Sequence, residues 1–290
     1  MFLFKFNRAK TNFYLMMFVK KADGSSQPFE KSKVIRTCLR MHASEEHARA
    51  VADKVESKIY EGIPTKEILR MIFFYLKNYR PEVKYRIDLR EAISLMRPKP
   101  DFENFVFLLL KEYGYEASPP QLIQGNCVEH EVDVVARRGN ETVYVEVKHH
   151  FQHHTFTGVG VFLEAWSTFM DLLEGYEQHK NNFKFNKLLI VCNTKFSDHA
   201  LQYARCKNIT YIGWNVPEKS LEAMVEEKKF YPITLLKNMD RRIETRLGDN
   251  GIILLKQLVE TDFNELLKKT GMEKSKLRVI REKAVELLQK

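Results

Sequence analysis

The chain has 290 residues, 44% of them hydrophobic, and its 47 Lys and Arg residues outnumber 38 Asp and Glu residues to give a net charge of +9. This length predicts two or three domains of ordinary size, and the hydrophobic content excludes an intrinsically disordered chain. The basic excess favours a polyanionic partner, for which nucleic acid is the first candidate.

The cysteines and the N-terminal residues indicate the compartment in which the protein is expected. The four cysteines are far apart and have no Cys-x-x-Cys spacing, so a zinc ribbon is not predicted. No run of about 18 apolar residues predicts a membrane span. Residues 1–17 begin with an apolar stretch that Lys5 interrupts, and they lack a signal-peptide cleavage site. We expect these residues to form a strand-like or poorly ordered extension of a reduced, cytoplasmic protein.

Residues 18–97 predict a strand, a turn and a helical bundle. The strand is Phe18-Val-Lys-Lys, and Gly24 supplies an unusual backbone angle in the turn that follows. Helices are expected from Lys31 onward, over residues 43–60 with an apolar stripe, and over residues 66–76. Thr65 is expected to cap the last of these helices.

Residues 100–238 predict a mixed sheet between helices. A buried helix at 102–113 is followed by two strands, a long helix at 160–178, an apolar strand at 187–192, a helix at 197–207 with Ser197 as its cap, and a strand at 209–213. This order is typical of an α/β (mixed α+β) sandwich.

Residues 240–290 are predicted to be helical and rich in Lys and Arg. Short helices separated by the turn Thr270-Gly-Met272 resemble a helix-hairpin-helix module, which contacts DNA phosphates without reading bases. The alternative is a helical cap that packs on the preceding domain.

Charged residues alternate with valines in the two strands near the middle of the chain. Glu131 and Asp133 are expected on one face of the first strand, with Val132 and Val134 on the other. The turn signal at residues 137–140 predicts that this strand pairs with the next one along the chain.

In that next strand Glu146 and Lys148 share a face, opposite the valines between and before them. An Asp, a Glu and a Lys on one sheet face suit a metal-dependent phosphodiesterase, because carboxylates bind Mg²⁺ and a lysine can orient water or stabilise phosphate charge. The alternative is a half-exposed hairpin with its charges in water.

These residues resemble the PD-(D/E)XK motif of Mrr-type restriction endonucleases, especially a subgroup in which the nuclease domain follows an ATP-cone. The matching phrases are Gln124-Gly-Asn-Cys-Val-Glu-His-Glu-Val-Asp-Val-Val-Ala136, Cys192-Asn-Thr-Lys-Phe-Ser-Asp-His-Ala200, Ile212-Gly-Trp214 and Phe230-Tyr-Pro-Ile-Thr-Leu235. The resemblance implies a restriction-endonuclease-like mixed sheet flanked by helices, and a DNA endonuclease that uses Mg²⁺ or Mn²⁺.

The resemblance also implies roles for individual residues. Asp133 and Glu146 would bind the metal together with the carbonyl group of Val147. Lys148 would contact the scissile phosphate and the attacking water. Glu103, at the start of the buried helix, would complete or orient the metal shell.

Other polar residues near the motif leave alternatives open. Glu112 or Glu116 could replace Glu103, and Glu131 is expected either to support the site or to remain exposed. The histidines at 149, 150, 153 and 154 suggest a transition-metal site, but no Cys or carboxylate lies at ligand spacing around them. The resemblance implies that His150 assists phosphate binding. His130 is expected to be a hydrogen-bonded core histidine. The subgroup's arginine on the long helix is missing, and Gln178 and Lys180 are possible substitutes.

The N-terminal phrase Val19-Lys-Lys-Ala-Asp-Gly-Ser-Ser-Gln-Pro-Phe-Glu-Lys-Ser-Lys33, followed by Gly62-Ile-Pro-Thr65, resembles an ATP-cone. The resemblance implies that a purine nucleotide, ATP or dATP, lies among Val19, Lys21, Lys33 and Thr65. Ala22 and Gln27 depart from the family pattern and would weaken nucleotide binding. The alternative is a helical interaction module that has lost its ligand.

The expected domains are therefore an extension (1–17), an ATP-cone-like domain (18–97), a nuclease-like domain (100–238) and a helix-hairpin-helix-like module (240–290). The expected function is a metal-dependent, nucleotide-controlled DNA endonuclease that forms homo-oligomers. Two alternatives remain: a catalytically silent, nucleotide-responsive DNA-binding regulator, and an oligomeric interaction module.

Overall fold

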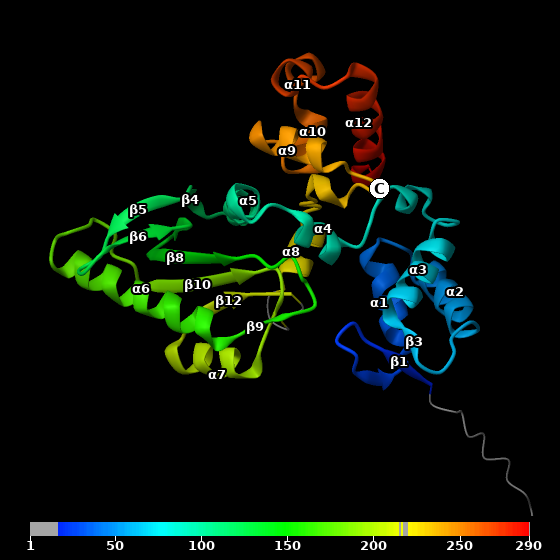
Figure 1. Ribbon diagram of the computed structural model, residues 1–290, viewed down its shortest axis with the longest axis horizontal. Helices are drawn as coiled ribbons and strands as arrows, with labels where there is room; N and C mark the ends of the chain where they lie inside the picture. Colours follow the sequence, from blue (N-terminus) through cyan, green and yellow to red (C-terminus); the bar gives the residue numbers. More distant parts are fainter. Residues whose placement is uncertain (1–16, 215, 217–219, 290) are drawn as a thin grey trace, which may run out of the picture. The chain divides into compact units, whose positions relative to one another are not determined.

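The computed structural model describes residues 17–214, 216 and 220–289, and the chain divides into two compact units, residues 1–81 and 82–290 (Figure 1). The extension expected at residues 1–17 lies, apart from Met17, outside the described residues. Over the ranges described, no helix has both the length and the apolar character to cross a membrane.

The described part of the first unit, residues 17–81, contains a three-stranded sheet and three helices. In the sheet, β1 lies between an antiparallel β2 and a parallel β3. Gly24 has a φ of 83° in the β1–β2 turn, which confirms the role predicted for it. The elements are β1 (Phe18–Lys20), β2 (Ser26–Pro28), α1 (Lys31–Arg40), α2 (Glu45–Glu56), β3 (Ile63–Pro64) and α3 (Thr65–Leu76).

Two helix boundaries in this unit differ from the prediction. α2 buries the apolar stripe as expected, but it ends at Glu56 rather than near residue 60, and the Ser57 hydroxyl donates to the Lys54 carbonyl there. The cap predicted for Thr65 is wrong: α3 begins at Thr65 itself, Pro64 occupies the cap position, and no side chain caps the helix. Thr65 has helical backbone angles, so its hydroxyl is not placed as a cap residue would place it.

The second unit is built on a five-stranded mixed sheet with the order β12-β10-β8-β7-β4. β8, β10 and β12 are parallel, and β7 pairs antiparallel with both β8 and β4, which confirms the predicted mixed fold. Two smaller sheets pair β5 with β6 and β9 with β11. The strands are β4 (Glu116–Ser118), β5 (Gln121–Gln124), β6 (Glu129–Val132), β7 (Val134–Arg138), β8 (Glu141–Lys148), β9 (Phe156–Thr157), β10 (Lys187–Cys192), β11 (Lys195–Phe196) and β12 (Thr210–Ile212).

Helices cover both faces of this sheet (Figure 1). Tyr144 and Ile190 pack in a core with α6 (Val159–Glu177) and α7 (Asp198–Lys207). The three valines of β8 pack on the opposite side in a core with α5 (Glu103–Glu112), as the alternation predicted. Ser197 caps α7 by accepting a hydrogen bond from Ala200, which confirms that prediction.

The C-terminal helices extend the α5-side core. Leu247, Leu255, Leu266 and Leu277 belong to the same buried cluster as Val145. The domain boundaries expected around residues 97–100 and 240 stay predictions. The remaining helical segments are η1 (Pro81–Tyr85), α4 (Leu89–Leu95), η2 (Pro98–Phe102), α8 (Leu221–Glu227), η3 (Ile233–Leu235), α9 (Arg241–Asp249), α10 (Leu255–Glu260), α11 (Phe263–Thr270) and α12 (Lys274–Leu288).

Candidate active site

Asp133 lies where the chain changes its pairing partner. β6 pairs with β5, whereas β7 pairs with β4 and β8, and Asp133 forms the bend between β6 and β7. The Asp133 side chain is buried, and its Oδ2 accepts a hydrogen bond from the Val147 N–H group at 2.8 Å. Because the β7–β8 register ends at the Val134–Val145 pair, Asp133 is brought alongside Glu146.

The bend corrects the prediction about the two faces of this strand. Val132 packs in the core under α6, whereas Val134 packs in the core on the α5 side. The expectation that these two valines share a face is wrong, because strict alternation holds only along a continuous strand. The bend thereby turns the Asp133 carboxylate toward the backbone of β8.

Glu146 lies on the α6 face of β8, two residues after Tyr144. The Tyr144 hydroxyl donates a hydrogen bond of 2.6 Å to Glu146 Oε2. Burial raises the pKa of Glu146, and the charge of Asp133 raises it further, to about 7, against the opposing effects of Tyr144 and Lys148. The Glu146 carboxyl group therefore exchanges its proton close to neutral pH.

Lys148 ends β8 on the same face, opposite Cys192 of β10. Its positive charge lowers the pKa of Glu146. No hydrogen bond or ion pair with another described residue engages its ammonium group. Lys148 is therefore available to bind an oxygen atom of a ligand.

Glu103 begins α5 and is buried beside Asp133. Of the three carboxylates considered for this place, Glu103 is the one that reaches the site: Glu112 ends α5, and Glu116 pairs with Arg137 at the opposite end of β7. Burial raises the pKa of Glu103, and the nearby charge of Asp133 adds to the effect. Burial also raises the pKa of Asp133.

A lysine that the sequence reasoning missed lies among these carboxylates. Lys99 Nζ is 3.1 Å from Glu103 Oε1, 2.9 Å from Glu131 Oε1 and 3.8 Å from Asp133 Oδ1. The signal that could have found it is the i,i+4 spacing from Lys99 to Glu103. Glu131 remains exposed and contacts Lys99, and its charge raises the pKa of Glu103 and of Asp133.

The donor set suits a hard divalent cation. Carboxylate oxygens are the ligands that Mg²⁺ and Mn²⁺ prefer, and the Lys99 ammonium group shows that a cation already lies among Glu103, Glu131 and Asp133. Within the described ranges, no group of three or more His, Cys, Asp or Glu side chains is arranged so that it could hold a metal ion. Lys99 and the Tyr144 hydroxyl are the groups that engage these carboxylates instead.

The histidines after Lys148 have separate partners. His149 Nε2 donates to the Ile93 carbonyl, at 3.1 Å, and His153 Nδ1 lies 3.1 Å from the Ser94 hydroxyl. The backbone of His150 is held on both sides by Asn193, at 2.8 Å each, and its ring contacts the Thr157 hydroxyl at 3.1 Å. These bonds fix the chain just beyond Lys148.

A second clamp fixes the loop that leads into β6. Asp171 of α6 accepts hydrogen bonds from His130 Nε2 at 2.7 Å and from the Cys127 N–H group at 2.8 Å. The predicted hydrogen bond of His130 is therefore confirmed, whereas the predicted core position is not, because the side chain is only partly buried. A Cβ atom at Gly125 would overlap the Asp171 carboxylate, so this position requires glycine. Lys180, considered above as a substitute for the missing arginine, donates to the Asn126 carbonyl at 2.6 Å.

The predicted nucleotide residues gather around the small sheet of the first unit. Val19 is buried in β1, and the Lys20–Pro64 pair brings Lys21 next to Thr65. Lys33 Nζ contacts Glu30 Oε1 at 2.7 Å and Gln27 Oε1 at 3.5 Å. The positive charge of Lys33 is therefore partly neutralised by Glu30.

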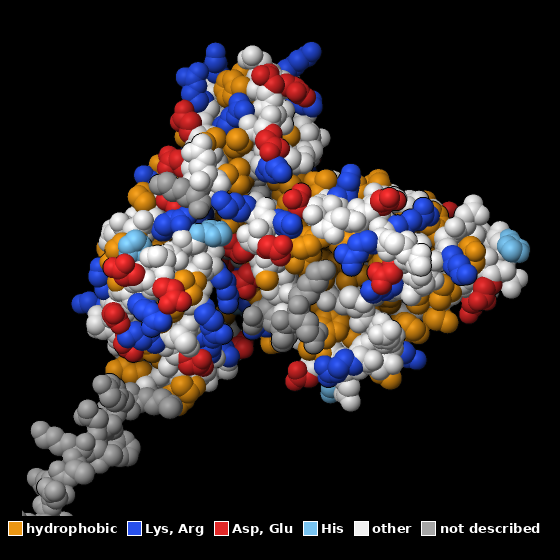
Figure 2. All heavy atoms as spheres, turned by 180° about the vertical axis from the view of Figure 1, so that it is seen from behind, with side chains coloured by type: hydrophobic (Ala, Val, Ile, Leu, Met, Phe, Trp, Pro, Cys, Tyr) orange, Lys and Arg blue, Asp and Glu red, His pale blue; other side chains and the backbone are white. Residues whose placement is uncertain are grey.

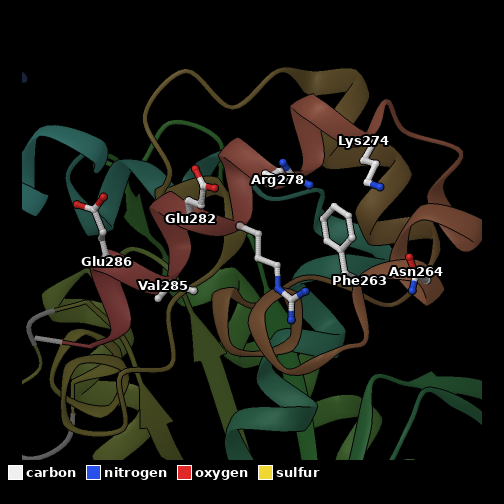
Figure 3. Close-up of a pocket in the computed structure, with 8 residues that line it drawn as sticks. Phe263, Asn264, Lys274, Arg278, Glu282, Val285 and Glu286 are labelled. Atoms are coloured by element: carbon white, nitrogen blue, oxygen red, sulfur yellow. The ribbon is translucent and has the colours of Figure 1, made fainter.

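A cavity of about 670 Å³ lies in the C-terminal helices, between residues of α11 and α12 (Figure 3). Its wall carries both signs of charge, with Lys274 and Arg278 near Glu282 and Glu286. None of the predicted site residues lines this cavity, which is formed by residues of the C-terminal helices alone.

Three family models match successive parts of the chain. An ATP cone domain matches residues 17–92, a restriction endonuclease domain matches residues 96–213, and a domain described as AF1548-like, C-terminal matches residues 231–288. The first two of these domains follow one another in the order that the resemblance predicted.

One relative and one solved structure extend this match. The chain is 35% identical to an uncharacterized protein of Archaeoglobus fulgidus over 173 residues, which is 59% of this chain and 93% of that protein. It also resembles the crystal structure of a protein of unknown function, AF1548, with a TM-score of 0.55 and 30% identity over 70% of this chain and 99% of that one. The chain therefore belongs to the family of Mrr-type restriction endonuclease-like proteins that carry an N-terminal ATP-cone.

Proposed function

We propose that the protein is a Mg²⁺- or Mn²⁺-dependent DNA endonuclease that hydrolyses phosphodiester bonds. The observation that carries the proposal is the side-by-side placement of Asp133 and Glu146, with Lys148 next on the same face as Glu146 and its ammonium group unpaired among the described residues. The restriction endonuclease domain matched over residues 96–213 supports a nuclease.

The residues divide the chemistry among them. Asp133, Glu146 and the Val147 carbonyl would hold the cation, with Glu103 completing or orienting the shell. When bound, the cation acts as a Lewis acid on the phosphate and lowers the pKa of an attacking water. Lys148 binds a phosphate oxygen and stabilises the charge that develops there. Tyr144 fixes the orientation of the Glu146 carboxylate through its hydrogen bond.

DNA is the proposed substrate because the net charge of +9 favours a polyanion. On the face drawn in Figure 2, Lys and Arg side chains are interspersed with acidic ones, and several lie at the outer end of the C-terminal helices at the top of the view. The exposed basic residues of this end are Lys268, Lys269, Lys274, Lys276 and Arg278. We propose that these helices contact DNA phosphates, as the helix-hairpin-helix resemblance implies.

Cleavage assays test the enzyme claim. Wild type, Lys148→Ala and the control Lys187→Ala are incubated with Mg²⁺ or Mn²⁺ and with supercoiled and linear DNA, methylated and unmethylated. Lys187 is a suitable control because it lies in the neighbouring strand β10 and pairs with Glu141, away from the site. We expect wild type and Lys187→Ala to cut, and Lys148→Ala to be slower by about 100-fold or more. Intact DNA in every wild-type reaction, or equal cutting by Lys148→Ala, would refute the proposal.

A silent regulator is the second candidate, and the Lys99 ammonium group among the carboxylates favours it. In that case the protein would shift DNA in a gel without cutting it, and its affinity would fall steeply with added salt. The cleavage assay separates the two candidates directly.

The ATP-cone supports nucleotide control of either activity. We propose that ATP or dATP binds beside Val19, Lys21, Lys33 and Thr65 and changes the oligomeric state of the protein. Lysines that neutralise phosphate and the N-terminus of α3 provide the physical basis. Light scattering with and without nucleotide measures the change in mass.

A further inference from the structure

Lys99 reaches from the surface into an acidic site. Its side chain is 56% exposed, whereas the side chains of Glu103 and Asp133 are 7% and 9% exposed. Its ammonium group nevertheless lies within 3.1 Å of Glu103 and 2.9 Å of Glu131. The lysine therefore brings a positive charge to carboxylates that are themselves shielded from water.

These carboxylates need a counter-charge. Buried groups of like charge repel one another more strongly than they would in water, so a site with Glu103, Asp133 and Glu146 close together is costly when it is empty of cations. Asp133 lies alongside Glu146 at the end of the β7–β8 register, and the Lys99 ammonium group lies between Asp133 and Glu103. Lys99 is positioned to offset part of this repulsion.

The backbone around Lys99 is held in place, whereas the ammonium group of Lys99 can move. Arg97 donates two hydrogen bonds to the buried Asp101, at 2.6 and 2.8 Å, and a third to Asp249 at 2.6 Å. Lys99 lies between these anchored residues, on a flexible four-carbon stem that is half in water. Its ammonium group can therefore leave the carboxylates without any rearrangement of η2.

We propose that Lys99 is an exchangeable counter-cation, whose ammonium group neutralises the carboxylates in the metal-free protein and moves into water when a divalent cation takes the same oxygens. The inference rests on the proposed metal-dependent function. It adds that metal binding is an exchange of one cation for another, so that Lys99 sets the metal concentration that the protein requires. A permanent structural ion pair would instead remain in place.

Two measurements on the full chain test the exchange. The first is calorimetric titration of Mn²⁺ and Ca²⁺ into wild type, Lys99→Met and the control Lys111→Met. Lys111 is an exposed lysine on α5 whose ammonium group lies over the Phe107 ring, 5.3 Å from its centroid. We expect Lys99→Met to bind metal about tenfold or more tightly than wild type, because the competing charge is gone, and Lys111→Met to match wild type.

The second measurement is the acetylation rate of the Lys99 amine, followed by mass spectrometry in chelator and in saturating Ca²⁺. We expect Lys99 to react slowly in chelator and several-fold faster with Ca²⁺, while Lys111 reacts equally in both. Glu131→Gln, which weakens the anchor and changes an exposed side chain, should raise the Lys99 rate in chelator. Thermal melting of each variant verifies that it is folded.

The outcomes separate this inference from the nuclease proposal. If wild type binds metal while Lys99 stays unreactive and Lys99→Met binds no tighter, the exchange is refuted and the nuclease proposal stands. If neither wild type nor Lys99→Met binds metal, both fail. If Lys99→Met binds metal and wild type does not, Lys99 blocks the site permanently, so the exchange is refuted and the silent regulator becomes the better description of wild type.

Discussion

At the scale of single residues, burial shifts the pKa of the carboxyl groups that the proposed chemistry uses, and Glu146 is the clearest case. Its pKa is raised from 4.5 to about 7 by burial and by Asp133. A carboxyl group with a raised pKa binds its proton more tightly in the folded protein, so its contribution to stability is present below pH 4.5 and is lost as the pH rises to about 7. Burial of the Glu146 carboxylate therefore lowers the stability of the metal-free protein at neutral pH, whereas a bound cation would offset this cost.

Replacing Glu146 by Gln should therefore stabilise the metal-free protein at high pH. We expect Glu146→Gln to gain on the order of 2–3 kcal/mol over wild type at pH 8 and to match it near pH 4. Urea unfolding in chelator, followed by tryptophan fluorescence, measures the difference. Glu141→Gln is the control, because Lys187 lowers the pKa of Glu141 and no gain is expected there. If the difference in unfolding free energy between Glu146→Gln and wild type does not increase from pH 4 to pH 8, the expectation is contradicted.

The sequence predicted the motif residues more readily than their partners. Asp133, Glu146 and Lys148 were accessible because strand alternation is a local pattern. Lys99 and its contact with Glu131 depend on chain segments that only the folded protein brings together. The hydrogen bond from Tyr144 to Glu146 depends on a side-chain rotamer that no sequence pattern specifies.

Among the elements, strands and helices were predictable but the bend at Asp133 was not. Charged and apolar residues alternate from Glu131 to Val134, across the bend, so this periodicity gives no sign that β6 and β7 belong to different sheets. What fixes the entry to β6 is Asp171, far along the chain in α6. Partial burial works against the charge of Asp171, yet hydrogen bonds led by that from His130 lower its pKa to about 2.

The Asp171 clamp should be a measurable source of stability. We expect Asp171→Asn to lose about 2 kcal/mol at pH 7, because charge-assisted hydrogen bonds to His130 and Cys127 are broken. A carboxyl group with a lowered pKa stabilises the fold at pH values above its ordinary pKa of 3.8. The difference in unfolding free energy between wild type and Asp171→Asn should therefore narrow as the pH falls toward 2. Glu174→Gln, one turn further along α6, should change stability by less than about 0.5 kcal/mol. Equal unfolding midpoints for Asp171→Asn and wild type would argue against the clamp.

At the scale of the whole molecule, the two compact units carry different parts of the proposed function. The first contains the predicted nucleotide residues and the second contains the carboxylates. Both tryptophans, Trp166 and Trp214, belong to the second unit. Tryptophan fluorescence therefore reports the unfolding of the second unit, while calorimetry reports both.

This separation gives a test for where the nucleotide acts. At a concentration 100 times its Kd, ATP or dATP should stabilise the first unit by about 2.7 kcal/mol, which raises the midpoint of a unit of this size by roughly 10 °C or more. We expect a calorimetric transition to move by this amount while the tryptophan transition stays in place. Lys33→Ala should weaken nucleotide binding about tenfold by removing one phosphate contact, and Lys58→Ala, an exposed lysine beyond α2, should leave it unchanged. If both transitions move together, nucleotide binding is not confined to the first unit, and if neither moves, the ATP-cone has lost its ligand.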